Sequence, residues 1–424
     1  MVSDGFGHVF EIADYEAAGM RLFQSERIPS GEWIPLPIGS DIMELPGRIP
    51  VAFDRRTSSW ASPQTHNGLP IMAVAAFAAP AYTLLYLAAY RTEAGAPVLP
   101  LFAYAPVGWR DGLFWIPAVR VDSDVRHDPD RFRANAVLKA AERMLQKHVG
   151  NRLVEHLVRH CVRHYRCPNA QNFVLERWEC PVPISPSCTA ECVGCISEQS
   201  ASNVKPTQNR ISFVPSVEEI LEFAVPHLKT AARAMISFGQ GCEGEPLMQS
   251  RLVERVIRQI RMATQRGTIH LNTNASDPEA VDRLFRAGLD SIRVSLNSAR
   301  QDDYSRYFRP KTYGFPDVIE SLKIARKCRA WISLNYLIFP GLTDHPDEIE
   351  ALLALLKNFR IDCIQTRNLN IDPEQYMRTL QLQQEDIPAS IGILKWMALI
   401  RREVPWIRLG YFNPPKEDWG TRSG

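Results

Sequence analysis

The sequence has almost no excess of charge of either sign. Its 424 residues include 49 Lys and Arg and 47 Asp and Glu, which leaves a formal net charge of +2. A broad basic surface would need a clear excess of Lys and Arg, so we expect no nucleic-acid partner. Nine cysteines are too few for a secreted disulfide scaffold of this length, and their number is odd.

The first residues lack the basic stretch and apolar core of a secretory signal. We therefore expect a cytoplasmic protein, and in that reducing compartment grouped cysteines are more often metal ligands or catalysts than disulfides. Residues 72–90 form an uncharged stretch of 19 residues, which is long enough to cross a bilayer. The stretch is rich in alanine and interrupted by Pro80, which favours a buried helix or helix pair, so we expect no membrane partner.

The chain also lacks internal repeats and low-complexity tracts, and its 45% hydrophobic and 23% charged residues are typical of a globular protein. Changes in composition and in the spacing of apolar residues along the chain predict three domains. Residues 1–168 form an N-terminal α+β domain of unknown role, with a strand near 112–116 and one or two helices over 135–165. Residues 169–375 form the central domain, and residues 376–424 form a short C-terminal helical extension.

The central domain alternates between expected strands and helices. Short apolar runs predict strands at 173–175, 234–238, 268–271, 291–296, 331–338 and 361–367. About six strand–helix units in this span indicate an α/β fold with a parallel sheet. Both a doubly wound sheet and an incomplete barrel fit this pattern, and in both the ligand site lies at the C-terminal ends of the strands.

Three cysteines follow the first expected strand with the spacing C-x3-C-x2-C, at Cys188, Cys192 and Cys195. Thiolates are soft ligands that suit zinc or iron–sulfur clusters. Three close thiolates without a local fourth suit a [4Fe–4S] cluster with one open iron. The alternative is a zinc ion or a structural cluster, with the fourth ligand drawn from Cys167, Cys180 or Cys242.

This cysteine spacing, placed before a strand–helix alternation, resembles the radical SAM (S-adenosyl-L-methionine) enzymes over residues 170–370. The resemblance implies a partial (β/α)6 TIM-type barrel in which Cys188, Cys192 and Cys195 hold a [4Fe–4S] cluster that binds SAM. It further implies reductive cleavage of SAM to a 5′-deoxyadenosyl radical, which abstracts hydrogen from an unidentified substrate. An electron donor such as flavodoxin or ferredoxin would be the partner.

The resemblance also implies the residues that contact SAM. The segment Glu243-Gly244-Glu245-Pro246 is similar to the family's GGEP segment, which holds the methionyl amino group. The polar residues near the ribose are then expected to be Ser295 and Asn297. Gly341 is expected near the adenine, and Arg367 is expected to face the active site. The sequence departs from the family pattern at two positions: Glu243 replaces the first glycine of GGEP, and Gly194 replaces an aromatic residue beside the adenine.

Other cysteines have weaker claims to chemistry. Cys161 and Cys167, with His160 and His164, form a candidate second metal site that Cys180 could join, but Cys161 lies on an apolar helical stripe that favours packing. Packing is also the expected role of Cys242, Cys328 and Cys363.

Two further interpretations of residues 239–246 are weaker. Glu243 and Glu245 have a poor spacing for an acid–base pair, and the glycines lack the lysine of a phosphate-binding loop. The competing function, in which the cysteines are structural, is a non-catalytic interaction protein that binds zinc or a structural iron–sulfur cluster.

Overall fold

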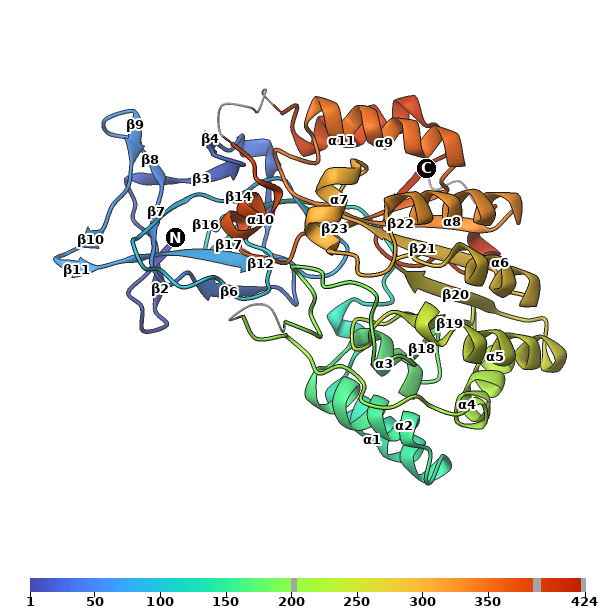
Figure 1. Ribbon diagram of the computed structural model, residues 1–424. Helices are drawn as coiled ribbons and strands as arrows, with labels where there is room; N and C mark the ends of the chain where they lie inside the picture. The colour runs from blue at the N-terminus through green and yellow to red at the C-terminus, as the bar shows by residue number, and fades with distance from the viewer. Residues whose placement is uncertain (200–203, 384–389, 421–424) are drawn as a thin grey trace.

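The computed structural model describes residues 1–199, 204–383 and 390–420. Antiparallel strands from the first part of the chain lie at one end of the molecule, and a parallel sheet with its helices forms the other end (Figure 1). The boundaries of the three predicted domains stay a prediction.

The parallel sheet runs in chain order from β18 to β24, which makes the fold an α/β partial barrel. Its strands are β18 (Glu179–Val182), β19 (Met235–Phe238), β20 (Thr268–Thr273), β21 (Ser291–Leu296), β22 (Trp331–Ile338), β23 (Cys363–Asn368) and β24 (Arg408–Gly410). The connecting helices are α4 (Val217–Thr230), α5 (Ser250–Ala263), α6 (Pro278–Ala287), α7 (Gln301–Phe308), α8 (Phe315–Lys327), α9 (Pro346–Phe359), α10 (Pro373–Leu380) and α11 (Ile393–Glu403). The sheet therefore has seven described strands where six were expected, because β24 in the predicted helical extension pairs in parallel with β23.

Local signals in the sequence fix several of these elements. Helix α6 begins at Pro278, and the Asp277 side chain accepts a hydrogen bond from the Ala280 N–H. It ends at Gly288, whose φ of 115° is a left-handed conformation that suits glycine. Ser216 and Glu219 form a reciprocal capping box at the start of α4.

Two expected elements are wrong. The apolar run at 173–175 is not the first strand, because Pro168 starts helix α3 (Pro168–Val174) at a favourable first position; the strand is β18, a few residues later. Residues 72–90 are not helical but contribute the four strands β12 (Met72–Phe77), β13 (Tyr82–Leu84), β14 (Leu87–Ala88) and β15 (Tyr90–Thr92). Each pairs with a strand distant in sequence, and such tertiary pairing overrides the helical preference of alanine. No helix of the described residues combines the length and apolarity that crossing a membrane requires.

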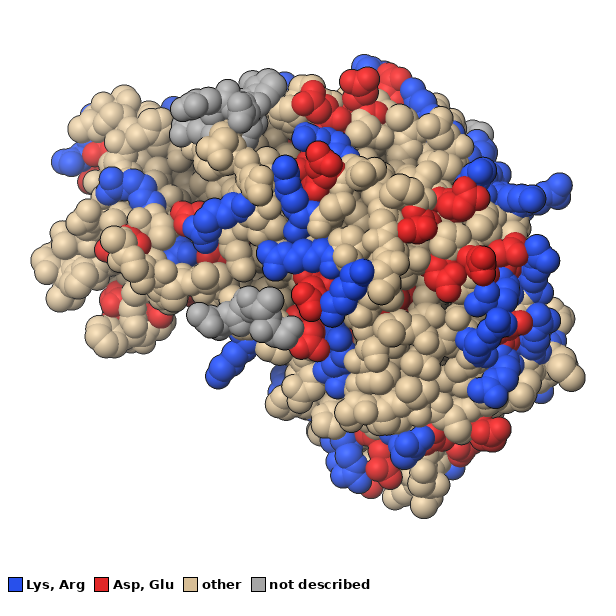
Figure 2. All heavy atoms as spheres, in the orientation of Figure 1, with Lys and Arg blue, Asp and Glu red and all other residues tan. Residues whose placement is uncertain are grey.

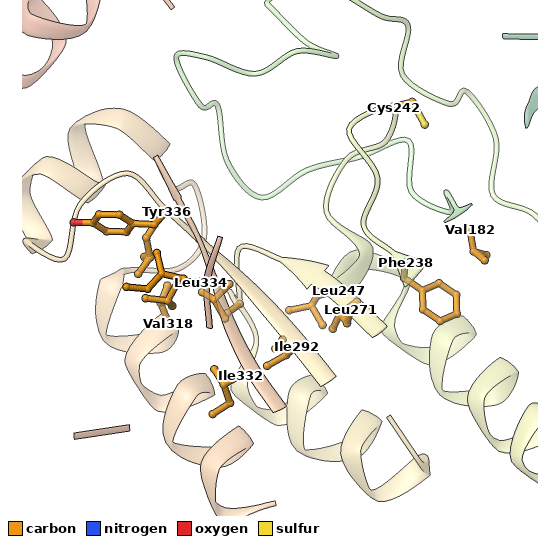
Figure 3. Packing of buried hydrophobic residues seen from close by; sticks show 14 of the residues in the cluster. Val182, Phe238, Cys242, Leu247, Leu271, Ile292, Val318, Ile332, Leu334 and Tyr336 are labelled. Atoms are coloured by element: carbon orange, nitrogen blue, oxygen red, sulfur yellow. The ribbon is translucent and has the colours of Figure 1, made fainter. Parts of the chain in front are cut away.

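Helices precede the parallel sheet, as the periodicity over 135–165 predicts. They are α1 (Ala134–Lys147), α2 (Arg152–His156), a π-helix (Leu157–His164) and α3. Their apolar faces join the large hydrophobic core of the sheet and its helices. This core packs against the outer face of the strands, as Figure 3 shows for Phe238, Leu271 and Ile292.

The N-terminal strands are short and antiparallel. They are β1 (Val2–Ser3), β2 (Val9–Phe10), β3 (Tyr15–Arg21), β4 (Gln24–Arg27), β5 (Trp33–Pro35), β6 (Asp41–Glu44), β7 (Arg48–Pro50), β8 (Ala52–Asp54), β9 (Ser59–Ala61), β10 (Thr65–His66), β11 (Leu69–Pro70), β12 to β15, β16 (Gly108–Arg110) and β17 (Leu113–Arg120). They form several small sheets around two small apolar clusters of their own.

Buried polar contacts fix these strands beside the C-terminal end of β23. Arg48 Nη2 lies 2.9 Å from Asp372 Oδ2 in an ion pair that is almost fully buried. The same carboxylate accepts the Leu99 N–H at 2.8 Å. Thr83 and Thr366 share a hydrogen bond of 2.7 Å. Lys, Arg, Asp and Glu are interspersed over the helices of the molecular face in Figure 2.

Candidate functional site

The three cysteines of the C-x3-C-x2-C segment lie on the loop that leaves the C-terminal end of β18. Cys188, Cys192 and Cys195 are all partly exposed. The loop is held against α7, because the Val193 N–H donates to the Tyr307 carbonyl at 3.0 Å. The position agrees with the expectation that the ligand site of a parallel sheet lies at the carboxyl ends of its strands.

Burial and neighbouring groups raise the pKa of two of the three thiols. Burial raises the pKa of Cys188 to about 11, and the nearby Glu245 carboxylate acts in the same direction. Burial also raises the pKa of Cys192 well above its usual value, reinforced by Cys188 and Cys195. A metal that binds these sulfurs must therefore displace protons, which is the usual coupling of metal affinity to thiol ionisation.

The triad is not a compact group of ligand atoms. Among the described residues, one group of His, Cys, Asp or Glu has all its ligand atoms within 4.8 Å of one another, and the triad is not that group. Arg210 Nη2 also donates to Cys195 Sγ at 3.6 Å.

The loop after β19 carries Glu243 and Gly244 and lies against the segment that precedes Cys188. Glu243 is buried and accepts four backbone N–H groups at 2.6 to 3.0 Å, from Ile184, Ser185, Gly239 and Gln240. Burial raises the pKa of this carboxyl to about 8, and the four donors oppose the shift. The two oxygens of Glu243 thus bind the ends of two neighbouring strands together.

Gly244 and Glu245 complete this contact through the backbone. The Gly244 N–H donates to the Ser185 carbonyl at 2.7 Å, and the Glu245 N–H donates to the Ser187 carbonyl at 2.8 Å. A Cβ on Gly244 would lie 1.9 Å from the Ser187 carbonyl oxygen, so the contact requires glycine. Pro246 begins the short 3-10 helix Pro246–Gln249 that leads into α5.

The Glu245 carboxylate reaches across to the end of β20. It accepts the Asn274 N–H at 2.8 Å and the hydroxyl of Thr273. Burial raises the pKa of Glu245 to about 7, while these hydrogen bonds act in the opposite direction. Glu245 therefore lies between the turn after β20 and Cys188, whose pKa it helps to raise.

The end of β21 places Ser295 and Asn297 differently. Ser295 is half-buried beside Asn335 of β22. Asn297 is buried, and its amide donates to the Asp303 carbonyl at 3.0 Å and to the Tyr376 hydroxyl at 3.2 Å. Its Oδ1 atom is buried without a hydrogen-bond partner among the described residues. A ligand hydroxyl would satisfy this acceptor, which fits the predicted ribose contact.

Two other predicted contacts have partners within the protein. Gly341 has a φ of 99°, and a Cβ there would lie 2.8 Å from the Leu22 nitrogen, so this glycine permits close packing of the N-terminal region. Arg367 donates to Asn335 Oδ1 at 3.2 Å and to the Tyr411 carbonyl at 2.6 Å. The structure gives both residues roles in positioning neighbouring elements.

The inner face of the strands is polar. Glu179 accepts the Ser237 hydroxyl at 2.6 Å, and Arg293 donates to Gln365 Oε1 at 2.6 Å. Asn413 links β18 to β23, because it accepts from Gln365 at 2.8 Å and donates to Glu179 at 3.3 Å. Burial lowers the pKa of Arg293 to about 9, which leaves it charged at neutral pH. The interior therefore suits a polar ligand.

An aromatic residue does lie beside Gly194, and sequence reasoning missed it. A Cβ on Gly194 would be 2.6 Å from the Tyr307 hydroxyl, so the hydroxyl end of this α7 side chain takes the space of the side chain that glycine lacks. Tyr307 is buried and packs edge-on against Tyr376. No local pattern links positions 194 and 307, since only the tertiary structure brings them together.

One of the remaining cysteines differs from the expectations. Packing was the favoured role of Cys161 over a candidate site with Cys167, His160 and His164, and Cys161 is buried in the core, where it lies with Cys242 and His156. Cys328 was expected in the core but is exposed, because it lies at the C-terminal cap of α8. Cys363 is buried as predicted.

Comparison with known proteins agrees with this geometry. Residues 182–356 match the model of the Radical SAM superfamily. A probable dual-specificity RNA methyltransferase RlmN 2 of Protochlamydia amoebophila (strain UWE25) is 25% identical over 181 residues, which cover 40% of this chain and 48% of the relative. A GTP 3′,8-cyclase of Streptomyces coelicolor (strain ATCC BAA-471 / A3(2) / M145) is 33% identical over 113 residues, 26% of this chain and 32% of the relative.

Solved structures give weaker matches. HydG, a maturase of the [FeFe]-hydrogenase, aligns with a TM-score of 0.39 at 15% identity, over 68% of this chain and 67% of that one. Native anSMEcpe with bound AdoMet aligns with a TM-score of 0.36 at 16% identity, over 45% and 52%. The chain spans about half the length, or less, of the first curated relatives it matches. The sequence match establishes that the chain contains a radical SAM domain.

Proposed function

We propose that this protein is a radical SAM enzyme of the cytoplasm that acts on an unidentified substrate. The observation that carries the proposal is the junction of two loops at the carboxyl ends of β18 and β19. The loop with Cys188, Cys192 and Cys195 is hydrogen-bonded to the loop with Gly244 and Glu245 through backbone groups. The contact brings three soft ligands and a buried carboxylate into one place.

In this proposal the three cysteines each bind one iron of a [4Fe–4S] cluster and leave one iron open to SAM. When bound and reduced, the cluster supplies the electron that cleaves SAM to methionine and a 5′-deoxyadenosyl radical. A flavodoxin or ferredoxin is the proposed electron donor. The polar inner face of the sheet is the proposed binding surface for the substrate.

The surrounding residues bind and orient SAM. Glu245 is placed to accept from the methionyl ammonium, because a buried carboxylate forms strong charge-assisted hydrogen bonds. The unpaired Oδ1 of Asn297 is the proposed acceptor for a ribose hydroxyl. Ser295, Gly341 and Arg367 remain proposed neighbours of the cofactor, and Tyr307 provides the aromatic surface that Gly194 cannot.

Anaerobic reconstitution tests this function. The full chain should bind about four irons in the form of one cubane cluster. With a strong reductant it should then convert SAM to methionine and 5′-deoxyadenosine. Cys192→Ala should lose the cluster and the cleavage, whereas Cys328→Ala, at an exposed position, should retain both.

Two outcomes would contradict the proposal. One is a Cys192→Ala protein that still makes 5′-deoxyadenosine at the rate of the unchanged chain. The other is a reconstituted chain that binds one zinc ion at the triad and never cleaves SAM, which would favour the non-catalytic metal-binding protein.

A further inference from the structure

A second group of potential metal ligands lies outside the cysteine triad. The ligand atoms of His156, Cys161 and Cys242 all lie within 4.8 Å of one another, and no other group of three His, Cys, Asp or Glu in the described ranges meets that limit. The two sulfurs are 3.9 Å apart. They come from different layers, since Cys161 belongs to the π-helix and Cys242 to the loop after β19, where Figure 3 shows it beyond Phe238.

One nitrogen of His156 has no partner. Its Nε2 atom is buried and makes no hydrogen bond within the described structure. A buried imidazole nitrogen without a partner costs free energy, and native proteins usually satisfy such an atom with a hydrogen bond, a water or a metal. Cys161 and Cys242 are only 4% and 7% exposed and lie in the large apolar core.

The π-helix brings two of these ligands onto one face. Five residues advance about 500° around an α-helix, which would leave His156 and Cys161 roughly 140° apart. The π-helix over Leu157–His164 has hydrogen bonds to the fifth preceding residue, as from the Tyr165 N–H to the His160 carbonyl at 2.9 Å. This wider turn brings positions five apart closer to one face than an α-helix does, and π-helical turns are frequent at functional sites.

The ligand set and its spacing fit zinc. A tetrahedral ion with Zn–S bonds of about 2.3 Å holds two sulfurs roughly 3.8 Å apart. Two thiolates and a neutral imidazole also cancel the charge of Zn²⁺, and a neutral complex can be buried among apolar side chains at little cost. Binding would release the two thiol protons to solvent, with no change of oxidation state.

We propose that His156, Cys161 and Cys242 bind a zinc ion that is separate from the iron–sulfur cluster. The ion ties the helical layer before the sheet to the loop that carries Glu243, Gly244 and Glu245. Its fourth ligand is solvent or His160, whose ring centroid is 5.1 Å from that of His156. The site is structural: it fixes the loop on which the proposed SAM contacts stand.

The experiment separates this site from the cluster. In the full chain purified anaerobically, we expect about one zinc per chain in addition to the irons. Cys161→Ala and Cys242→Ala should each lose that zinc while the iron content and the SAM cleavage survive in part. Cys363→Ala, which removes another buried thiol, should retain the zinc.

A variant with alanine at Cys188, Cys192 and Cys195 removes the other sulfur ligands. It should still bind one Co²⁺ per chain with the visible bands of a tetrahedral thiolate site, and Zn²⁺ should displace the cobalt and raise the melting temperature. Adding Cys242→Ala should abolish these bands, and His156→Ala should shift or abolish them. His160→Ala should shift them only if this imidazole is the fourth ligand; unchanged bands assign that place to solvent.

Three results would overturn the proposal. The first is a triad-free variant that folds, as judged by its melting transition, and binds neither Co²⁺ nor Zn²⁺. The second is cobalt binding with the same bands after Cys242→Ala. The third is a native protein in which thiol alkylation and mass analysis show Cys161 and Cys242 joined in a disulfide. None of these results depends on whether the cluster cleaves SAM.

Discussion

The two cysteine groups of this molecule are built in opposite ways. Cys188, Cys192 and Cys195 come from one loop, are partly exposed, and are not the compact group of ligand atoms found among the described residues. Cys161 and Cys242 come from segments 81 residues apart and are buried with His156 in a compact group. An exchangeable ligand needs the open arrangement, whereas an ion that only holds two layers together needs the closed one.

The loop after β19 joins the two groups, so a change in it should have the largest effect. Gly244→Ala would place a Cβ 1.9 Å from the Ser187 carbonyl oxygen. Backbone must move to relieve this collision, and we expect a loss of about 3 kcal/mol or more in the free energy of unfolding. Iron loading should fall as well, because Ser187 precedes Cys188.

Urea unfolding and iron analysis measure both effects. Gly31→Ala is the matched control, since its Cβ would meet nothing within 4 Å, and it should change the free energy of unfolding by less than about 0.5 kcal/mol. A Gly244→Ala protein with unchanged stability and iron content would show that the two loops are not packed as described.

Glu243→Gln should have the next largest effect. The carboxylate accepts four N–H groups, whereas glutamine offers one acceptor oxygen and turns an NH₂ group toward two donors. We expect a loss of about 2–3 kcal/mol in the free energy of unfolding. Glu191→Gln, at an exposed position, is the control and should lose little. Equal midpoints for the two variants in urea would mean that the Glu243 contacts contribute no stability.

Buried His270 predicts how the stability of the protein depends on pH. His270 lies 2.6 Å from the Ser291 hydroxyl and 2.9 Å from Asn272 Oδ1, and burial lowers its pKa to about 3. In the unfolded chain the pKa of this histidine is near 6.5. As the pH falls, the unfolded state therefore binds the proton at a higher pH than the folded state does. Stability that is complete above about pH 6.5 should therefore decline toward pH 3, at about 1.4 kcal/mol per pH unit for this residue.

Urea midpoints between pH 7 and pH 5 test this dependence. His270→Asn should remove its share of the slope, whatever its effect at neutral pH. The buried His127, whose pKa is also lowered to about 3, should continue to contribute in the variant. An unaltered slope in His270→Asn would contradict the assignment.

The smallest expected effect concerns the wall of the triad site. Tyr307→Leu removes the ring whose hydroxyl meets Gly194 and keeps a buried apolar side chain. If this ring provides the aromatic surface for SAM, its loss should raise the Kd of SAM about 2- to 10-fold, in line with about 0.5–1.5 kcal/mol for an aromatic contact. Equilibrium binding to the reconstituted protein measures it, with Tyr15→Leu in the N-terminal strands as control. Equal affinities would remove Tyr307 from the site.

The sequence predicted what depends on neighbours in the chain. The spacing of Cys188, Cys192 and Cys195 and the strands at 291–296 and 331–338 are local patterns, and the strands lie where they were expected. The seventh strand was missed because β24 has only three residues. Residues 72–90 were misjudged because their pairing partners are distant in sequence, which no periodicity reveals.

The same reason explains the missed parts of the site. The four donors to Glu243 come from two separate strand ends, so its role as a clamp is visible only in the fold. Cys161 was correctly placed on an apolar stripe, but that stripe meets Cys242 through a tertiary contact. His156 was not included in the candidate group because residues five positions apart do not lie on the same face of an ordinary α-helix.

The π-helix over Leu157–His164 has a consequence for the spacing of two ligands in the sequence. A π-turn corresponds to one residue more than the α-helix that it interrupts. Deleting a single residue between His156 and Cys161 would restore α-helical geometry and leave the two ligands four residues apart, a spacing that also places them on one face. The π-turn therefore lets a five-residue spacing present the two ligands as a four-residue spacing does on an ordinary α-helix.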